Sequence, residues 1–386
     1  MVKNKSKIIR VTTVPISLGK LLMGQLKFMS QYYDMIGISS KGERDAIDSV
    51  SKQEGIEIIP VEMTRKITPI QDLKAVYKLY KVFRKEKPDI VHSHTPKAGT
   101  LSMLAAKLAG VPHRLHTIAG LPLLEATGPK RILLDIVEKL TYSCATMIYP
   151  NSFGLKDIII DNNYTKIKKL KVLANGSSNG IDTSHFDPVT YTKEDNVKLR
   201  KELNIDASDI VFIFVGRFVA DKGINELIAA FKKINRGYIN TKLLLVGTYE
   251  KELDPLLPET EIEIDTNINI ISVGWQHDVR PYFAISNALT FPSYREGFPN
   301  VVMQAGSMGL PSIVTDINGC NEIVSEGLNG TIIPVKSSDA LYNAMKKLII
   351  DQDYSNNLAL NARMVICENY ERQHVWDAIL EEYRQL

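Results

Sequence analysis

Short apolar runs rich in Val and Ile alternate with helix-length amphipathic segments along most of the chain. Apolar runs of this length are typical of strands buried on both faces, and helices between such strands make parallel crossovers. The pattern therefore predicts a doubly wound α/β fold with parallel sheets. In the first half, the predicted strands are 7–13, 35–40, 56–61, 90–94, 114–118 and 146–150, and the predicted helices include 20–32, 73–86, 98–110 and 130–142.

The alternation stops between residues 172 and 188, where Gly, Asn, Ser and Asp are frequent, as is typical of a linker. We therefore expect two Rossmann-like domains, 1–175 and 190–370, with the amphipathic terminal segment 374–386 packing back. Ligands of open α/β sheets bind at the carboxyl ends of strands, so the cleft between the domains is the expected site. The predicted strands of the second half are 210–216, 242–247, 269–274, 288–293, 311–316 and 330–335.

The composition is that of an ordinary soluble globular protein, and the net charge of +3 is too small to indicate nucleic acid as a partner. Two basic clusters, Lys81–Lys87 and Thr165–Lys171, fit either solvated surfaces or a flank against an anionic membrane. The three cysteines are far apart and form no CxxC, which argues against disulfides and fits a reducing cytosol. Neither a signal peptide nor an apolar run near the ~18 residues of a spanning helix is recognisable.

The segment FVGRFVADKG (Phe214–Gly223) places two cations around a predicted strand-to-helix loop. Arg217 and Lys222 suit a diphosphate, whose charge they neutralise in the ground state and again as a phosphate leaves. The alternative is two surface cations on an ordinary loop, because the motif alone is weakly specific.

The segment REGFPNVVMQAGSMGLP (Arg295–Pro311) combines one acid, several glycines and a predicted helix start near Pro299 or Asn300. Free backbone N–H groups at that start favour a phosphate. Glu296 and Gln304 are eight residues apart, about two helical turns, so we expect both on one face toward the cleft. The alternative is a cap residue and a surface amide.

Together these segments resemble the family 4 retaining glycosyltransferases of the GT-B fold. The segments that carry the resemblance are VGRFVADKG (215–223), PSYREGFPNVVMQAGSMGLPSIVTD (292–316), NGCNEIV (318–324) and NGIDTSHF (179–186). In the first half, VTTVPISLGKLLMGQL (11–26), VHSHTPKAG (91–99) and HTIAGLPLLEATGPKR (116–131) resemble a bacterial subgroup. Members of that subgroup extend polyprenyl-diphosphate-linked sugars for capsule, O-antigen or glycan assembly.

The resemblance implies a role for each matching residue. Arg217 and Lys222 would hold the diphosphate of a UDP-sugar, and Glu296 would contact the donor sugar. Gln304 stands where the family carries a Glu that receives the ribose hydroxyls; its amide oxygen is a weaker, neutral acceptor. The other donor-site residues implied are Gly216, Trp275, Gln276, Gly297, Phe298, Pro299, Asn300 and Val301.

In the first half, Ser17 and Gly19 lie in a predicted strand-to-helix loop that can approach the donor phosphate. A GxGxxG motif is missing there, so a nicotinamide cofactor is poorly supported. The family has a histidine after the fifth strand; alignment on HT selects His116, whereas alignment on T-x-H-G-L places Ala119 there. We assign His116, with a hydrogen-bonded structural histidine as the alternative. The four histidines 92, 94, 113 and 116 have no neighbouring Cys or acidic cluster that would complete a zinc site.

Two segments are candidates for the acceptor. In Gly120–Arg131, the apolar tip Leu121–Leu124, which includes Leu123, would meet lipid while Lys130 and Arg131 meet phosphate. An ordinary buried loop is the alternative. Thr95 and Lys97 open a predicted helix after HSH, whose N-terminus would bind the acceptor's diphosphate.

The predicted activity is metal-independent transfer of a sugar, an N-acetylated hexosamine, with retention, from a UDP-sugar to a polyprenyl-diphosphate-linked saccharide. The resemblance implies that no metal is needed, and DQD (351–353) is expected to be a surface turn rather than a metal motif. The protein would work at the cytoplasmic face of the membrane as a peripheral protein. Two alternatives stay open: a UDP-sugar epimerase of the same fold, and a non-catalytic sugar-nucleotide-binding subunit, which Gln304 favours.

Overall fold

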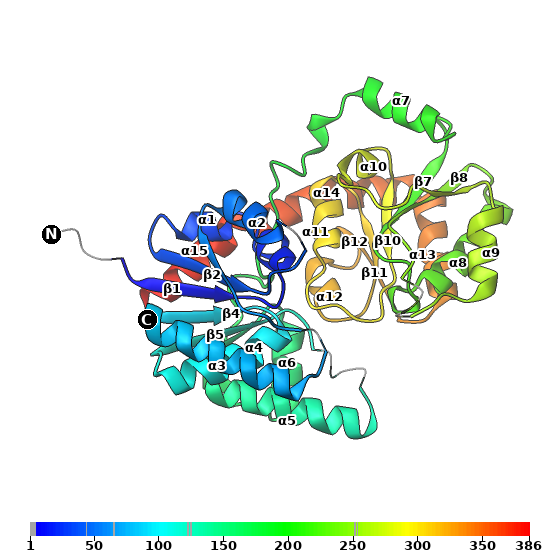
Figure 1. Ribbon diagram of the computed structural model, residues 1–386. Helices are drawn as coiled ribbons and strands as arrows, with labels where there is room; N and C mark the ends of the chain where they lie inside the picture. Colours follow the sequence, from blue (N-terminus) through cyan, green and yellow to red (C-terminus); the bar gives the residue numbers. More distant parts are fainter. Residues whose placement is uncertain are drawn as a thin grey trace. The chain divides into compact units, whose positions relative to one another are not determined.

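The computed structural model of the chain describes residues 5–43, 45–64, 66–121, 123, 126–250, 252 and 254–386. Contacts divide the chain into two compact units, Met1–Gly180 with Gln373–Leu386 and Ile181–Arg372 (Figure 1). The predicted domains, 1–175 and 190–370, fall inside these two units.

The first unit is built on a six-stranded parallel sheet of order β3-β2-β1-β4-β5-β6. The order runs outward in both directions from β1 and β4, so the topological switch point lies between these two strands. The strands are β1 (Lys7–Val11), β2 (Asp34–Ser39), β3 (Glu57–Pro60), β4 (Ile90–Ser93), β5 (His113–Ile118) and β6 (Met147–Pro150).

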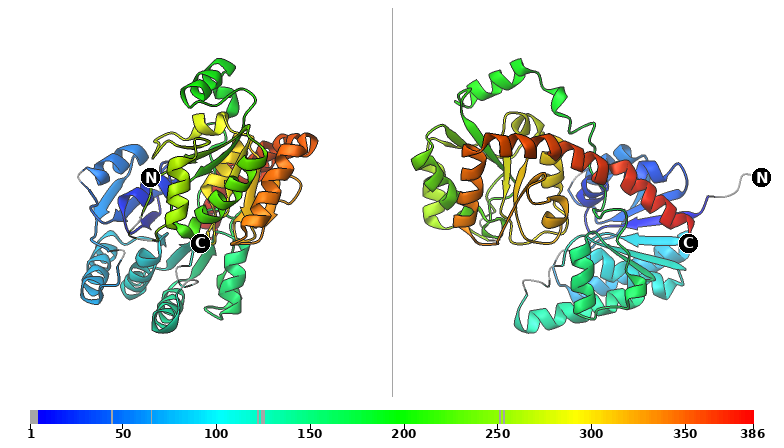
Figure 2. Two further views of the ribbon diagram at one scale, coloured as in Figure 1. Left: turned by 90° about the vertical axis from the view of Figure 1, so that its right-hand side faces the viewer. Right: turned by 180° about the vertical axis from the view of Figure 1, so that it is seen from behind.

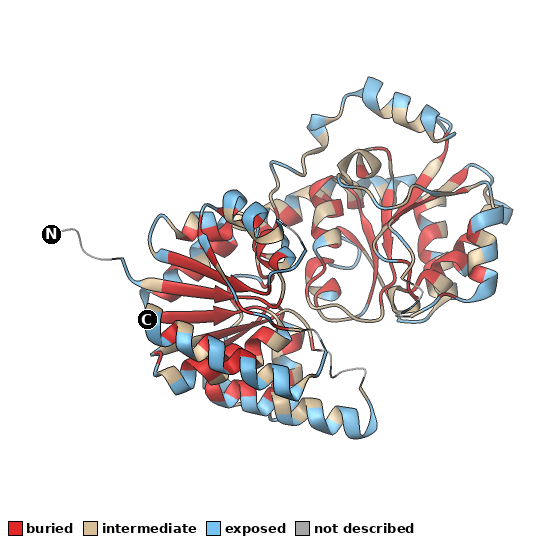
Figure 3. Cartoon of the chain, in the orientation of Figure 1, coloured by how far each residue is buried: buried red, intermediate tan, exposed pale blue. Residues whose placement is uncertain are grey.

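Helices cover both faces of this sheet, and each face has its own core. On one face Ile9 and Val11 pack with α3 (Pro69–Glu86), α4 (Pro96–Ala109), α5 (Gly128–Cys144) and α6 (Phe153–Asp161). On the other, Ile8 packs with the π-helix η1 (Ser17–Leu21), α1 (Gln25–Met29), α2 (Ala46–Glu54) and α15 (Arg372–Arg384). The strands are accordingly buried, whereas the outer helix faces are exposed (Figure 3). The last helix, α15, is the red helix that lies against this sheet (Figure 2).

The second unit repeats the architecture with the parallel order β12-β11-β10-β7-β8-β9, so its switch point lies between β10 and β7. Its strands are β7 (Ile210–Val215), β8 (Thr241–Val246), β9 (Ile270–Ser272), β10 (Ala288–Phe291), β11 (Ser312–Thr315) and β12 (Gly330–Ile333). Its α-helices are α7 (Lys193–Glu202), α8 (Ile224–Gly237), α9 (Pro258–Thr266), α10 (Arg280–Ala284), α11 (Asn300–Ser307), α12 (Cys320–Ile323), α13 (Ser338–Ile350) and α14 (Gln352–Tyr370).

The predicted fold class is confirmed: all twelve predicted strands are present, and they form two parallel α/β sheets. The predicted helix 20–32 is wrong as a single helix, because Gly24 adopts a left-handed φ of 78° between η1 and α1. Glycine adopts this conformation without the steric cost that a side chain would add, so the chain bends there.

Candidate active site

An ion pair between Lys222 and Glu296 lies at the switch point of the second sheet. Lys222 follows β7, Glu296 follows β10, and these strands are neighbours. The Lys222 Nζ is 2.5 Å from Glu296 Oε1, and both side chains are largely shielded from solvent. The structure therefore brings together a cation and a carboxylate that are 74 residues apart in sequence.

The backbone around this pair is closely packed, and two glycines make that possible. Gly223 has φ of 70°, and a Cβ there would lie 2.1 Å from the carbonyl oxygen of Pro292. Gly319 has φ of 77°, and a Cβ there would lie 2.4 Å from the carbonyl oxygen of Gly297. The loop that carries Glu296 is thus held from both sides by chain segments that tolerate only glycine at the contact.

Polar side chains fix the same loop. Arg295 pairs with Asp221 at 2.9 Å, which ties it to the segment that carries Lys222. Asn318 donates from Nδ2 to the carbonyl oxygens of Glu296 and Gly297, at 2.5 and 3.3 Å. Cys320 is buried nearby: burial, with the charge of Glu296 adding to it and that of Lys222 opposing it, raises the pKa of its thiol well above the usual range.

Helix α11 begins at Asn300, as predicted, with Pro299 as its N-cap. The first N–H groups of a helix, here those of Asn300 and Val301, have no intrahelical acceptor. No side chain caps this end in their place. The expectation that helical spacing aligns Glu296 with Gln304 is wrong, because Glu296 precedes the helix and lies in a loop. Gln304 is on the helix and half-buried.

The remaining predicted donor-site residues of the second unit differ in exposure. Arg217 follows Gly216 and pairs with Glu250 at 2.8 Å, with 45% and 39% of the two side chains exposed. The Trp275 ring is 62% exposed and lies edge-to-face with His277, which leaves it accessible to a planar ligand. Gln276 donates to the carbonyl oxygen of Val273. Gly297 is half-buried and Phe298 is buried against Tyr370.

His116, the predicted catalytic histidine of the first unit, is a buried strand residue. Its Nδ1 lies 2.8 Å from Ser93 Oγ, and burial lowers its pKa to about 4, so it is neutral at physiological pH. The ring packs against the start of α4, where a Cβ on Gly99 would come within 2.3 Å of it. This environment is that of the structural alternative, a hydrogen-bonded histidine beside the strand.

The loop after β1 contains Ser17 and Gly19 within η1. Ser17 is half-buried, and its N–H donates to the carbonyl of Val14. A Cβ on Gly19 would lie 2.9 Å from Val50, so this glycine is needed for packing against α2. Its small size therefore has a structural reason that the sequence did not reveal.

At the switch point of the first sheet, Thr95 links the segments that follow β1 and β4 through hydrogen bonds to Thr13. Its hydroxyl accepts from the N–H of Thr13 at 3.0 Å and bonds the Thr13 hydroxyl at 2.7 Å. Lys97 pairs with Asp72 of α3 at 2.6 Å, with both side chains mostly shielded. Both predicted acceptor residues thus already have protein partners.

The segment predicted to meet lipid is largely internal. Leu121 and Leu123 are 5% and 1% exposed and belong to the core under α3, α4 and α5, so the predicted lipid contact is wrong for these two residues. Leu124 lies outside the described residues. Arg131 bonds Asp135, Tyr164 and the Leu123 carbonyl, which is a structural role. Lys130 is exposed.

Within the described residues, no group of three or more His, Cys, Asp or Glu side chains could hold a metal ion. Asp351 of the DQD segment caps α14 by accepting from the N–H of Tyr354 at 2.9 Å, and Gln352 and Asp353 begin that helix, so the segment is an exposed helix start rather than the turn expected there. Each described helix is too short or too polar to cross a bilayer.

Comparison with known proteins identifies the family to which this chain belongs. The family model "Glycosyl transferases group 1" matches residues 195–365, and "Glycosyl transferase 4-like" matches residues 22–152. The chain is 35% identical to the capsular polysaccharide biosynthesis glycosyltransferase CapM of Staphylococcus aureus, over 98% of this chain and 96% of that protein. The chain therefore belongs to this glycosyltransferase family, and the predicted resemblance is confirmed.

A second relative and a solved structure extend the comparison. The chain is 28% identical to UDP-Gal:alpha-D-GlcNAc-diphosphoundecaprenol alpha-1,3-galactosyltransferase of Escherichia coli, over 98% of this chain and 97% of that protein. The crystal structure of HepE from Anabaena in complex with UDP superposes with a TM-score of 0.81 at 18% identity, covering 98% of this chain and 100% of that one. At that identity the likeness concerns the fold alone.

Sequence reasoning missed three residues of the site in the second unit. Asp221 and Arg295 lie inside segments already singled out, but only the fold shows that they pair. Asn318 belongs to NGCNEIV, which carried the resemblance but received no role. The signal that would have found it is its position after a strand, at the edge where ligands bind.

Proposed function

We propose that the protein transfers a sugar from a UDP-sugar to a polyprenyl-diphosphate-linked saccharide in surface polysaccharide synthesis. The observation that carries the proposal is the Lys222–Glu296 pair at the switch point, beside the uncapped start of α11. The names of the two curated relatives, one for capsule synthesis and one for UDP-galactose and a diphosphoundecaprenol acceptor, support the substrate classes.

In this proposal the donor diphosphate lies against Lys222, Arg217 and the first N–H groups of α11. These positive groups stabilise the charge that develops on the leaving phosphate, so the reaction does not require a metal ion. Displacing Lys222 toward the diphosphate would release Glu296 to accept from hydroxyls of the donor sugar.

The transfer proceeds with retention, by attack of the acceptor hydroxyl on the same face that the UDP leaves. The bond from the anomeric carbon to the phosphate oxygen breaks, the bond to the acceptor oxygen forms, and the acceptor proton passes to the leaving phosphate. Glu296 acts here through hydrogen bonds to the sugar, and no covalent glycosyl-enzyme forms. The resemblance to retaining transferases supports this stereochemistry.

The test is UDP release that depends on acceptor. Purified protein would be incubated with UDP-galactose, UDP-N-acetylglucosamine or UDP-N-acetylgalactosamine and a polyprenyl-diphosphate-linked saccharide, with and without a chelator. We expect one donor to support acceptor-dependent release that the chelator leaves unchanged, and NMR of the product to show the donor's anomeric configuration. The panel also decides whether the donor is the expected N-acetylated hexosamine.

Two results would contradict the proposal and select one of the alternatives. Interconversion of UDP-sugars without acceptor would identify an epimerase. Tight UDP binding without turnover of any donor would identify a non-catalytic binding subunit.

We further propose peripheral contact with the cytoplasmic face of the membrane. The support is chemical: a polyprenyl-linked acceptor is confined to a bilayer, so the enzyme has to reach that surface.

A further inference from the structure

Helix α5 carries apolar side chains on its outer face as well as on the face that packs against the core, where Leu134, Tyr142 and Cys144 lie. Its buried residues are Glu138, Thr141, Tyr142 and Cys144, of which three carry polar side chains. Its outer face carries four exposed aliphatic residues: Ile132, Leu133, Ile136 and Leu140. Their spacing places them on one stripe about two turns long. We call these four residues the α5 stripe.

A stripe of this kind is unusual for a helix that packs on a sheet, because apolar residues normally face the core. Ile132 is 62% exposed and Ile136 is 59% exposed. Meanwhile burial raises the pKa of the Glu138 carboxyl on the opposite side. The helix thus keeps an acid inside and aliphatic side chains outside, so the α5 stripe is suited to a partner beyond this unit.

The helix layer around the α5 stripe is strongly cationic. Helices α3, α4 and α5 together contain ten basic and four acidic residues, a net charge of +6 (10 − 4), against +3 for the whole chain. Three of the acids pair with cations, Asp72 with Lys97, Glu86 with Lys7 and Asp135 with Arg131, and the fourth is the buried Glu138. The exposed charges of these three helices are therefore positive: Lys74, Lys78, Lys81, Arg84 and Lys85 on α3, Lys107 on α4, and Lys130 and Lys139 on α5.

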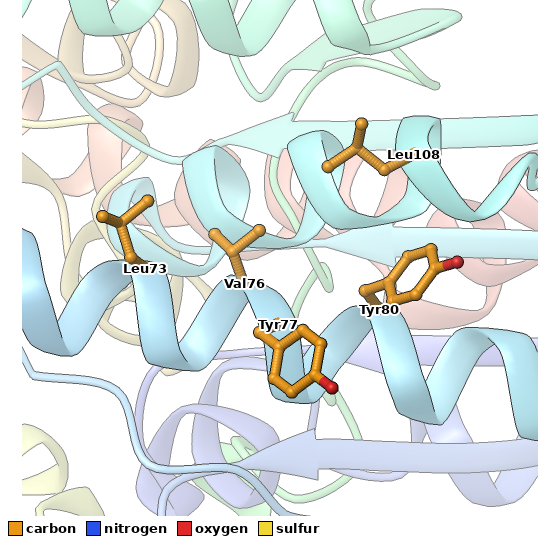
Figure 4. A pocket seen from close by; sticks show the side chains of 5 residues that line it. All are labelled: Leu73, Val76, Tyr77, Tyr80 and Leu108. Carbon is orange, nitrogen blue, oxygen red and sulfur yellow. The ribbon is translucent and has the colours of Figure 1, made fainter.

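Helix α3 adds apolar groups to the same layer. Leu73 and Tyr77 are exposed between its lysines, and the Lys81 ammonium lies 4.6 Å from the Tyr77 ring centroid. A shallow apolar depression lies between α3 and α4 (Figure 4). It is lined by Leu73, Val76, Tyr77 and Tyr80 of α3 and by Leu108 of α4. Because α4 packs against both α3 and α5, the depression and the α5 stripe belong to one helix layer of the sheet.

We propose that the outer surface of α3 and α5 docks on an anionic lipid bilayer, with the α5 stripe inserted among the acyl chains and the lysines at the headgroups. This inference rests on the proposed function, for which it names the membrane-contacting surface. Aliphatic side chains flanked by lysines match a bilayer interface in both polarity and charge. A second copy of the chain is a poorer occupant, because a symmetric contact would bring two equally cationic surfaces together.

The test is co-sedimentation with vesicles of phosphatidylcholine alone or mixed with phosphatidylglycerol. The stripe variant is Ile132→Gln with Ile136→Gln. The matched control is Ile262→Gln with Ile268→Gln in the second unit, where Ile262 is also 62% exposed but lies on the acidic helix α9. A third variant replaces Lys74, Lys78 and Lys81 by Gln.

We expect the wild type and the control to bind mixed vesicles alike, and pure phosphatidylcholine vesicles much more weakly. The stripe variant should bind about tenfold more weakly or worse, because two aliphatic side chains no longer leave water. Each lysine removed should weaken binding about fivefold, an effect that added salt suppresses. Equal binding by the stripe variant and the wild type would overturn the proposal. So would a fall in oligomer mass in the stripe variant, which would assign the surface to a second copy.

Transfer to a water-soluble, short-chain acceptor separates this inference from the proposed function. The stripe variant should keep that activity while it loses transfer to acceptor embedded in mixed vesicles. If the proposed function fails, neither protein transfers sugar to the soluble acceptor, whatever their vesicle binding. If only the docking surface is wrong, both proteins use both acceptors equally.

Discussion

The two sheets share one topology, yet their switch points are built differently. In the second unit, β7 and β10 lead to Lys222 and Glu296, a charged pair whose loops are held by glycines and by Asp221–Arg295. In the first unit, the hydroxyls of Thr13 and Thr95 join the ends of β1 and β4, and Lys97 pairs with Asp72. Both edges therefore hold a shielded lysine–carboxylate pair, but in the second unit both partners come from segments that follow neighbouring strands, whereas Asp72 of the first unit belongs to α3.

The difference shows which inferences from sequence are dependable. The residues of the second unit were selected by motifs in which charged groups accompany glycines, and glycine marks backbone that must approach closely. The acceptor residues of the first unit were selected mainly by charge and apolarity near a loop. Charge alone does not distinguish a ligand site from an internal ion pair, as Arg131 and Lys97 show.

The largest expected effect is that of Glu296→Gln, which tests whether the switch point of the second sheet is the catalytic site. Removing the charge while keeping the shape should lower kcat by about a hundredfold or more, since it weakens hydrogen bonds at the reacting sugar. The Kd for UDP, measured by calorimetry, should change little, because Glu296 is assigned to the sugar. Activity close to that of the wild type would show that the assigned carboxylate is wrong.

Next in size is Gly223→Ala, which tests whether the switch point of the second sheet depends on the close approach of Gly223 to the backbone of Pro292. The substitution combines a left-handed φ with a clash against a carbonyl oxygen, and should destabilise the second unit by about 3 kcal/mol. Gly237→Ala is the matched control, since nothing lies within 4 Å of a Cβ there. Thermal unfolding followed by circular dichroism distinguishes them, and equal melting temperatures would refute the packing argument.

A third effect, confined to the first unit, is its loss of stability in acid. Burial lowers the pKa of His92, His94 and His116, the last to about 4 from an ordinary 6.5. The unfolded chain then binds more protons, so stability is complete above about pH 6.5 and falls as the pH drops toward 4, by up to about 1.4 kcal/mol per pH unit for each histidine. Urea unfolding at several pH values would measure it.

The buried Trp376 reports on this unit once Trp275, the other of the two tryptophans, is replaced by Phe. In His94→Leu the free energy of unfolding should fall less steeply as the pH drops. Both ring nitrogens of His94 lack hydrogen-bond partners within the described residues, so no hydrogen bond is lost with the ring. An unchanged pH dependence in that variant would contradict the assignment of the acid sensitivity to buried histidines.

The smallest expected effect is that of Gln304→Glu. If Gln304 receives ribose hydroxyls, a carboxylate should lower the donor KM by a few-fold at most, a difference of about 1 kcal/mol or less. Steady-state kinetics would show this, with Gln304→Ala as the control that raises KM. A large rise in kcat instead would place the catalytic carboxylate at position 304.

The sequence allowed the fold to be predicted almost completely, because buried parallel strands leave continuous apolar runs. It failed where one residue decides the local geometry. Gly24 divides a predicted helix, and the start of α11 at Asn300 leaves Glu296 outside the helical spacing assumed for it. Ion pairs such as Asp221–Arg295 join residues 74 positions apart, which no local pattern reveals. The exposure of the α5 stripe was hidden for the same reason: periodicity shows an apolar face but not what it faces.

The most direct test of the central claim, that the second unit holds the donor site, is hydrogen–deuterium exchange with and without saturating UDP. We expect slower exchange in peptides that cover Arg217–Gly223 and Glu296–Gln304, and unchanged exchange along the α5 stripe. If UDP binds and neither of these two segments is protected, the assignment of the donor site to the Lys222–Glu296 edge is contradicted.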